Sequence, residues 1–517
     1  MTRLTALLLL PVAASAALAP TSFHLALAGE GEMRISYSLN ASEASTCTYA
    51  ANASAPLTSD PATVRGYFPG LGFTHHVLLQ GLAPSTPYTY TCAGGPQYTF
   101  VSAPPSSSFS PFAMAVFGDW GYLGSKERGP SIPAGGLSTN WSAVPVRELL
   151  EGLKNNHSID LILHTGALPS FCWPFAGPPN AHTPPPPSPS SGDINYADDA
   201  FGEHPLKFMY EDVTSGWFEW ISNLSATLPY HVSVGNHESS CHSPVCLVDL
   251  VGIGLHESNF SAYTHRWEMN NHNSGGTSNM WYSVRRGGVH FVSINTETDF
   301  VGAEEAKTDD SHLLPAGGFG APGEYMRWLA ADLAAAAADP SVRWIIASGH
   351  RPFEDLPANH SAALAALFKA AGVAFYFCGH GHTYIRYGAD AFGAGAVQVM
   401  AGGAGSDETP WPKDQLSTPA PATANVQQRC AAWCAAFDAR EAAAAAATAR
   451  APPQASACRF CSGGSLGATP VATSDLYSAG YLQVQHDALT FSLLRAPDGA
   501  VLDTVTVTHP GAKGVGA

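Results

Sequence analysis

Five short segments of the sequence combine glycine with residue types that bind metal ions. They are Gly118-Asp119, Gly192-Asp193 with Tyr196, Gly235-Asn236-His237, Gly349-His350 and Gly379-His380-Gly381-His382. Glycine allows sharp backbone turns, so short side chains from several strand ends can reach one point. Carboxylate and phenolate oxygens together with imidazoles suit a pair of ions such as iron with zinc, manganese or a second iron. Each segment alone could be a turn, a helix cap or a surface loop, but the ordered set indicates a dinuclear metal centre.

The elements around these segments alternate between strand and helix patterns. Buried-strand runs occupy 113–117, 159–163, 231–234, 344–347 and 373–377, and helical spacing marks 144–153 and 324–337. We expect a helix-sized turn region after 377, a short helix at 441–447 and strands at 480–484 and 489–493. This alternation predicts an α/β layer fold whose site lies at the carboxyl ends of its strands.

Residues 20–103 have a different sequence pattern, in which short runs of alternating apolar and polar residues are separated by Gly, Pro, Ser and Asn. This pattern predicts a small β-sandwich. Cys47 and Cys92 are the only cysteines in it, so we expect them to pair. His75 and His76 are adjacent in a strand pattern and therefore point to opposite faces, which favours sheet histidines over a shared metal site.

Several features predict a secreted or lumenal protein, in a vacuole or outside the cell. Residues 1–19 combine Arg3, an apolar run and small residues, as in a signal peptide. Seven Asn-x-Ser sequons fit a secretory route: Asn40, Asn52, Asn140, Asn156, Asn223, Asn259 and Asn359. No later segment is apolar over the roughly 18 residues that a membrane span needs.

Seven of the eight remaining cysteines are interpreted in the same oxidising context. Cys430, Cys434, Cys458 and Cys461 favour two disulfides, with a zinc site as the alternative. Cys241 and Cys246 are expected to close a small loop, with two free thiols as the alternative. Cys378 lies in a strand run and is expected to be an inert core thiol.

The chain carries 24 Lys and Arg against 41 Asp and Glu, a net charge of −17. This balance argues against a nucleic-acid-binding surface, which needs a basic face. A net negative charge also cannot attract an anionic phosphate, so a locally cationic metal pair would have to do so. The sequence neither favours nor excludes a homodimer.

The ordered segments resemble those of the purple acid phosphatases, within the metallophosphoesterase superfamily. The resemblance implies a fibronectin/Ig-like β-sandwich at 20–103 and a two-sheet α/β/β/α catalytic domain at 112–405. Terminal strands in 471–517 would complete that domain, after an Ala- and Cys-rich insertion at 406–470.

The resemblance also implies a set of metal ligands. Asp119, Asp193, Tyr196 and His382 would hold a ferric ion, and Asn236, His350 and His380 a second divalent ion (zinc, iron or manganese). Asp193 would bridge the two ions, and the Tyr196 phenolate would produce the purple colour.

The implied activity is hydrolysis of small phosphate monoesters by a metal-bound hydroxide at acid pH. Asn236 and His237 would bind the phosphate. His360 would protonate the leaving alkoxide, with a solvent-exposed loop histidine as the alternative; a glycan on the Asn359 sequon would crowd the site.

The family motif around Asp193 is interrupted. Residues 167–192 are a Pro- and Ser-rich insertion between Gly166, at the end of a strand pattern, and the ligand Asp193. The segment is either an excursion loop or an intron translated in phase, and its composition favours the intron.

Two other functions are carried forward. One is a phosphodiesterase or nucleotide pyrophosphatase of the same superfamily. The other is a non-catalytic binding protein, if the insertion at 167–192 disables the metal site.

Overall fold

The structure is a computed structural model of the 517-residue chain. It describes residues 19–52, 54–124, 141–166, 209–239, 256, 258–298, 319–321, 323–406, 468, 470–474, 476–496 and 498–510. The predictions for the insertion at 167–192, Asp193, Tyr196, the helix at 441–447, Cys241–Cys246 and Cys430–Cys461 lie outside these residues. So do the signal peptide apart from residue 19 and the insertion at 406–470 apart from residues 406, 468 and 470.

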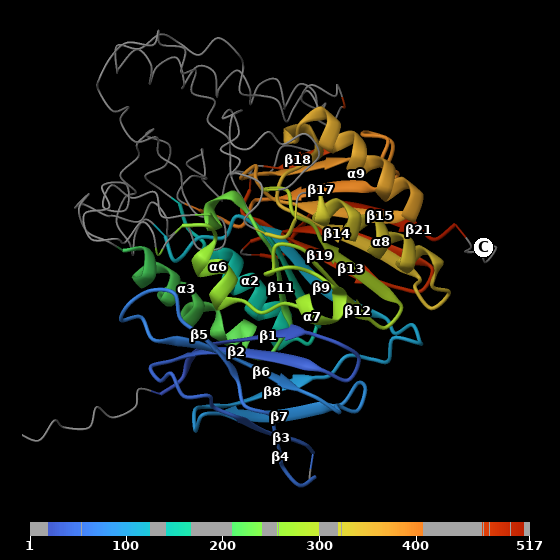
Figure 1. Ribbon diagram of the computed structural model, residues 1–517. Helices are drawn as coiled ribbons and strands as arrows, with labels where there is room; N and C mark the ends of the chain where they lie inside the picture. Colours follow the sequence, from blue (N-terminus) through green and yellow to red (C-terminus); the bar gives the residue numbers. More distant parts are fainter. Residues whose placement is uncertain are drawn as a thin grey trace, which may run out of the picture.

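The N-terminal part is a sandwich of two antiparallel four-stranded sheets, as predicted (Figure 1). One sheet has the order β1 (Thr21–Leu27), β2 (Met33–Leu39), β6 (Phe73–Leu79) and β5 (Thr63–Arg65). The other has the order β4 (Leu57–Thr58), β3 (Cys47–Ala51), β7 (Pro87–Cys92) and β8 (Gln97–Val101). Cys47 and Cys92 lie opposite each other on β3 and β7 and form the predicted disulfide.

His75 and His76 on β6 have different partners. His75 contacts the Ser45 hydroxyl at 2.6 Å and the Ala41 carbonyl at 2.9 Å. His76 contacts the Ser36 hydroxyl at 2.8 Å and the His265 carbonyl at 2.9 Å. Both rings are therefore hydrogen-bonded within the sandwich domain, and each has its own set of partners.

Two mixed sheets build the rest of the molecule. The first runs β11 (Tyr230–Ser233), β10 (Leu161–Thr165), β9 (Phe112–Gly118), β19 (Ser478–Val484), β20 (Ala488–Arg495) and β21 (Val501–Thr508). The second runs β12 (Tyr282–Arg286), β13 (Val289–Ser293), β14 (Trp344–Ser348), β15 (Val373–Cys378), β17 (Val397–Ala401), β16 (Tyr384–Tyr387) and β18 (Ala472–Ser474). Strands β9 to β11 are parallel to one another, as are β13, β14, β15 and β17, so their carboxyl ends meet at one edge of each sheet.

The two sheets pack face to face through alternating apolar side chains. Val116 of the first sheet and Ile346 of the second belong to one buried cluster, and the rings of Phe377 and Phe491 lie 5.7 Å apart across it. The intervening residues, such as Phe117 and Ala347, belong to a second cluster that includes side chains from the helices. This alternation produces the α/β/β/α layers that the resemblance implied.

The described helices longer than one turn lie on the outer faces of the two sheets (Figure 1). They are α2 (Val144–Asn155), α3 (Tyr210–Ser225), α6 (Ser261–Arg266), α8 (Glu324–Ala338) and α9 (Ala358–Ala371), with the single turns α7 (Asn271–Ser274), η1 (Asn236–Glu238) and η3 (Phe353–Asp355) between strands. Gly372, with a φ of 71°, ends α9 because a left-handed residue there costs glycine nothing. None of the helices in the described part of the chain has the length and apolar character needed to cross a bilayer.

The sequence patterns missed α3, α9 and the hairpin β12–β13, and one expectation was wrong. Residues after β15 do not form a helix-sized region: β16 begins at Tyr384 and pairs with β17 and β18. All four residues of β16 are buried, and a fully buried strand has no alternation by which it could be recognised.

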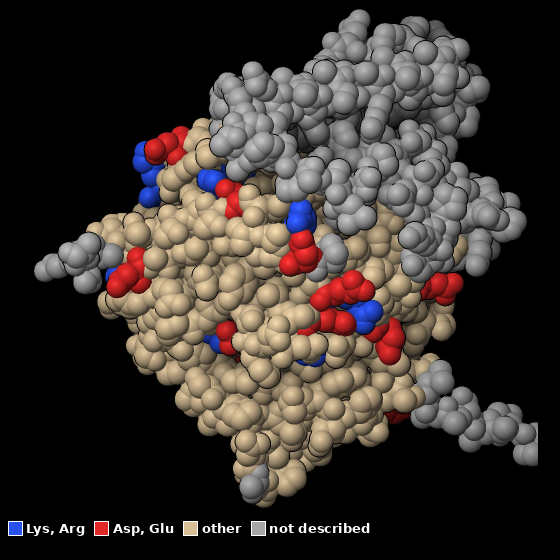
Figure 2. Space-filling model, turned by 180° about the vertical axis from the view of Figure 1, so that it is seen from behind, with Lys and Arg blue, Asp and Glu red and all other residues tan. Residues whose placement is uncertain are grey.

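Charged side chains are sparse on the face drawn in Figure 2, where most Lys and Arg lie next to Asp or Glu. Among the described residues, Arg343 pairs with Asp487 and Arg495 with Asp498. The described residues of this face therefore carry no extended basic patch, in line with the charge balance of the sequence.

Candidate metal centre

Most of the predicted ligands gather where strands end. Asp119 follows β9, Asn236 follows β11, His350 follows β14, and His380 and His382 follow β15. All five side chains are buried, with exposed fractions of 5% or less. The structure therefore brings together the predicted ligands that it describes, since the parallel strands place their carboxyl ends at one edge.

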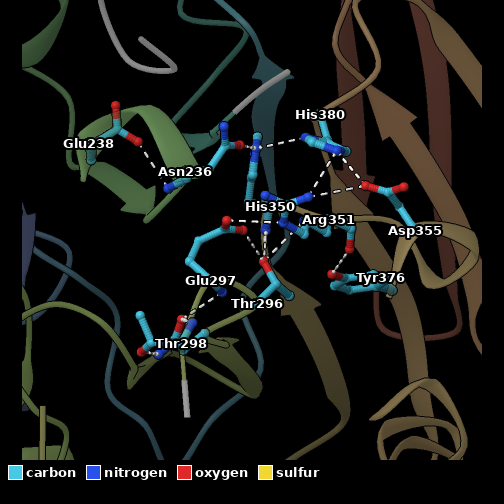
Figure 3. A network of polar contacts seen from close by, with 12 residues as sticks. Asn236, Glu238, Thr296, Glu297, Thr298, His350, Arg351, Asp355, Tyr376 and His380 are labelled. Carbon is cyan, nitrogen blue, oxygen red and sulfur yellow. Dashed lines mark hydrogen bonds and ion pairs between the residues drawn. The ribbon is translucent and has the colours of Figure 1, made fainter. Parts of the chain in front are cut away.

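The ligands form two groups. In the first, Asp119 Oδ1 lies 3.0 Å from His382 Nε2, and Ser406 Oγ lies 3.0 Å from His382 Nδ1. In the second, His350 Nε2 lies 2.8 Å from Asn236 Oδ1 and 3.2 Å from His380 Nδ1 (Figure 3). This division matches the two ion sites implied by the resemblance.

The donor atoms suit metal ions. Two donors each about 2.1 Å from one ion and at a right angle lie about 3 Å apart, which is the spacing within both groups. Oxygen and imidazole donors also fit iron, zinc or manganese. In the described residues no three or more His, Cys, Asp and Glu side chains are grouped to hold an ion. Each group contributes two such residues, Asn236 adds an amide to one, and Asp193 and Tyr196 are expected to complete the set.

Burial keeps the imidazoles of the second group neutral. Desolvation lowers the pKa of His380 to about 4, with the nearby Arg351 adding to the effect. Desolvation and the neighbouring His380 also hold the pKa of His350 well below its usual value. Metal ions bind the neutral form of histidine, so these rings are ready to bind at acid pH.

Two glycines allow the backbone to approach Asp119 closely. A Cβ on Gly379 would lie 1.9 Å from the Gly166 carbonyl oxygen and 2.7 Å from Asp119 Oδ2. A Cβ on Gly402 would lie 2.1 Å from the Gly381 oxygen and 2.5 Å from Asp119 Oδ2. Asp119 and His380 themselves have positive φ angles of 64° and 74°, which non-glycine residues adopt at a cost that is typical of functional sites.

We therefore expect Gly402→Ala to displace the Asp119 carboxylate. The added methyl group should weaken metal retention about tenfold or more, because the carboxylate cannot keep its position. Metal per chain after dialysis measures the effect. Gly388→Ala is the control, since its Cβ would meet only Val471 at 3.9 Å. Equal metal content in both variants would contradict the expectation.

A second set of buried residues supports His350, and the sequence patterns missed it. Thr296 Oγ1 accepts hydrogen bonds from the backbone N–H groups of His350 (3.2 Å) and Arg351 (3.0 Å). Arg351 Nε donates to Glu297 Oε2 at 3.0 Å, and Arg351 Nη1 to Asp355 Oδ2 at 3.2 Å. Thr296 and Glu297 follow β13. Polar residues after a strand could therefore have indicated this supporting set in the sequence, even though no glycine accompanies them.

Glu354 lies next to this set and should make stability depend on pH. Burial raises its pKa to about 7, although Gln398 Nε2 donates to its Oε2 at 2.8 Å. The folded protein then binds more protons than the unfolded chain between pH 4.5 and 7, so this contribution is complete below pH 4.5 and is lost as pH rises to 7.

Glu354→Gln imitates the protonated form and should remove this dependence. We expect the variant to gain about 2 kcal/mol in unfolding free energy relative to the wild type as pH rises through this window. Urea unfolding at several pH values measures it. Parallel pH profiles for the two proteins would show that Glu354 does not titrate in this range.

The two predicted catalytic histidines are both buried. His237 is 1% exposed and lies beside Asn236 in η1. His360 is 0% exposed and lies on α9, so the alternative of a solvent-exposed loop histidine is wrong. The helix turns His360 inwards, whereas the neighbouring Asn359 is exposed. Burial lowers the pKa of His360 to about 3, so the ring is neutral at mildly acid pH.

Comparisons with known proteins agree with this geometry. The family model described as Purple acid Phosphatase, N-terminal domain matches residues 20–110, and that described as Calcineurin-like phosphoesterase matches residues 112–384. An acid phosphatase of Aspergillus ficuum is 26% identical over 378 residues, which are 61% of this chain and 60% of that protein. Purple acid phosphatase 22 of Arabidopsis thaliana is 24% identical over 75% of this chain and 73% of its own length.

A solved structure has the same fold. It is the purple acid phosphatase PPD1 from yellow lupin (Lupinus luteus) seeds, with a TM-score of 0.58 over 95% of this chain and 74% of that chain. Its sequence identity is 16%, so the likeness concerns the fold alone.

Proposed function

Because this chain belongs to the calcineurin-like phosphoesterases and carries the N-terminal domain of the purple acid phosphatases, we propose that it is an acid phosphatase with a dinuclear metal centre. Its substrates would be small phosphate monoesters. The observation that supports this most is the convergence of Asn236 Oδ1, His350 Nε2 and His380 Nδ1, from three different strand ends, within 2.8–3.2 Å contacts. All three atoms are of types that bind metal ions, and their burial at one point supports a cation site there.

The proposed roles follow the two groups. Asp119 and His382, with Asp193 and Tyr196, would hold a ferric ion. Asn236, His350 and His380, with Asp193, would hold a second divalent ion. When bound, two cations neutralise phosphoryl oxygens and make water a stronger nucleophile. Asn236 and His237 would orient the phosphate.

The leaving alkoxide needs a proton, which we assign to His360. Its ring is buried on α9, and this burial lowers the pKa of His360 to about 3. The ring is therefore neutral above about pH 3 and would have to donate the proton of its neutral N–H. A substitution of His360 tests this role directly.

Secretion is part of the proposal. The Cys47–Cys92 disulfide supports an oxidising compartment, outside the cell or in a vacuole, because such bonds are rare in the reducing cytosol. The sequons at Asn40 and Asn156, both on exposed residues, are available for glycosylation there.

The test is to express the full chain and to measure its metal content, visible spectrum and hydrolysis of p-nitrophenyl phosphate and its bis-ester at acid and neutral pH. We expect two metal ions per chain, a tyrosinate-to-iron band and preference for the monoester at acid pH. Preference for the bis-ester would make the protein a phosphodiesterase. A colourless, metal-free and inactive protein would instead support a binding module.

A further inference from the structure

His380 uses its two ring nitrogens in different ways. Nδ1 lies 3.2 Å from His350 Nε2, within the second ligand group. Nε2 points away from that group and lies 2.5 Å from Asp355 Oδ2 (Figure 3). Asp355 is the last residue of η3, and its side chain is 3% exposed.

The contacts of Nε2 decide which nitrogen carries the proton. A carboxylate oxygen only accepts hydrogen bonds, so a 2.5 Å contact requires an N–H at Nε2. Arg351 Nη1 also lies 3.2 Å from Nε2, but guanidinium only donates and would require a lone pair there. The shorter, charge-assisted contact prevails, and Nη1 donates to Asp355 Oδ2 instead. Nδ1 therefore keeps its lone pair, facing the ligand group.

Asp355 is itself held in place. Arg351 is 0% exposed and lies between Glu297 Oε2 at 3.0 Å and Asp355 Oδ2 at 3.2 Å. The Tyr376 hydroxyl donates to the Arg351 carbonyl at 2.6 Å. These residues come from the ends of β13 and β14 and from within β15, so the carboxylate is anchored to three strands rather than to one loop.

We propose that Asp355 is a positioning residue for the second metal ion: it selects the Nε2–H tautomer of His380 and thereby presents Nδ1 as a ligand. Carboxylates that bond to the far nitrogen of a ligating histidine orient the ring and raise its basicity. Asp355 does not touch the ion or the substrate in this arrangement. The inference rests on the proposed function only in assuming that an ion binds between Asn236, His350 and His380.

The first test is zinc affinity. Metal-free full-length protein is titrated with Zn²⁺ against a chromophoric chelator, with Asp355→Ala compared with the wild type. We expect binding at one of the two sites to weaken about 10- to 100-fold. Asp355→Asn, which keeps an acceptor oxygen of similar reach, should lose less than Asp355→Ala.

A matched control exists at the other end of β13. There Asp332 Oδ2 lies 2.7 Å from His290 Nε2, in a second Asp–His pair outside the ligand groups, whose side chains are 12% and 8% exposed. Asp332→Ala should leave zinc affinity unchanged. If Asp332→Ala weakens zinc binding as much as Asp355→Ala does, the effect is a general loss of packing and the proposal is overturned.

The second test reads the tautomer itself. Long-range ¹H–¹⁵N spectra of histidine-labelled, metal-free protein should show His380 with its proton on Nε2 in the wild type and in Asp355→Asn. In Asp355→Ala the Nδ1–H form should increase. A wild-type His380 protonated on Nδ1 would overturn the proposal even if Asp355→Ala fails to fold. A folded Asp355→Ala in which His380 keeps the wild-type tautomer would also overturn it.

The outcomes separate this inference from the proposed function. Weakened zinc binding in Asp355→Ala together with a wild type that hydrolyses no phosphate ester supports the inference and rejects the phosphatase. Unchanged zinc binding in an active enzyme rejects the inference alone. A wild type that binds no zinc rejects both.

Discussion

Replacing His350 with alanine should empty the proposed second ion site and lower the turnover of the proposed phosphatase by about three orders of magnitude. His350 Nε2 is the shared neighbour of Asn236 Oδ1 and His380 Nδ1, so its loss removes the central donor of that group. A cation that stabilises transition-state charge contributes several kcal/mol, and about 4 kcal/mol corresponds to a thousandfold change in rate. Metal per chain and kcat for p-nitrophenyl phosphate measure the two effects.

His486→Ala is the matched control for that experiment. His486 has a 60% exposed side chain and contacts the carboxylate of Asp487, so its removal should change neither metal content nor turnover. Loss of activity in His350→Ala with both ions retained would contradict the assignment of His350 as a ligand. It would leave a role in substrate binding as the explanation.

The second large effect concerns stability. Arg266→Met should lower the free energy of unfolding by about 3–5 kcal/mol, because it leaves the buried carboxylate of Glu211 without its guanidinium. Arg266 and Glu211 form an ion pair with side chains 4% and 7% exposed. Arg266 also donates to the Tyr67 hydroxyl at 2.8 Å and to Ser215 Oγ at 3.0 Å. Urea unfolding of the metal-free chain measures the loss.

Two further variants show whether the pairing explains that loss. Arg343→Met removes one of the two partners of Asp487, which is 66% exposed, and should cost no more than about 0.5 kcal/mol. The double variant Arg266→Met with Glu211→Met removes both charges and should recover part of the stability. A double variant no more stable than Arg266→Met alone would show that the loss comes from packing.

Much of the fold could be read from local patterns. The helices at 144–155 and 324–338 and the strands at 112–118, 344–348 and 373–378 lie within a few residues of their predicted limits. The helix α9 was missed because half of its residues are alanine, which leaves little contrast between its faces. The hairpin β12–β13 was missed because β12 has no clear alternation of apolar and polar residues. Four of its five residues are polar or aromatic.

The sequence by itself determined the donor types of the candidate centre and the strand ends that carry them. Asp119, Asn236, His350, His380 and His382 each follow a strand, and parallel strands bring their carboxyl ends to one edge. That rule needs only the order of the elements, so no coordinates were required. Asp193 and Tyr196 stay predictions of the same kind.

Only the tertiary structure decided how those ligands are held. The Asp355 contact that sets the His380 tautomer, the Arg351–Glu297 pair behind it and the burial of His360 all join residues from different elements. Such contacts leave no periodic trace in the sequence, because each depends on which side chains face one another once the two sheets have packed. The residue types of the candidate centre could therefore be predicted from the sequence. Their contacts depend on how distant strand ends pack together.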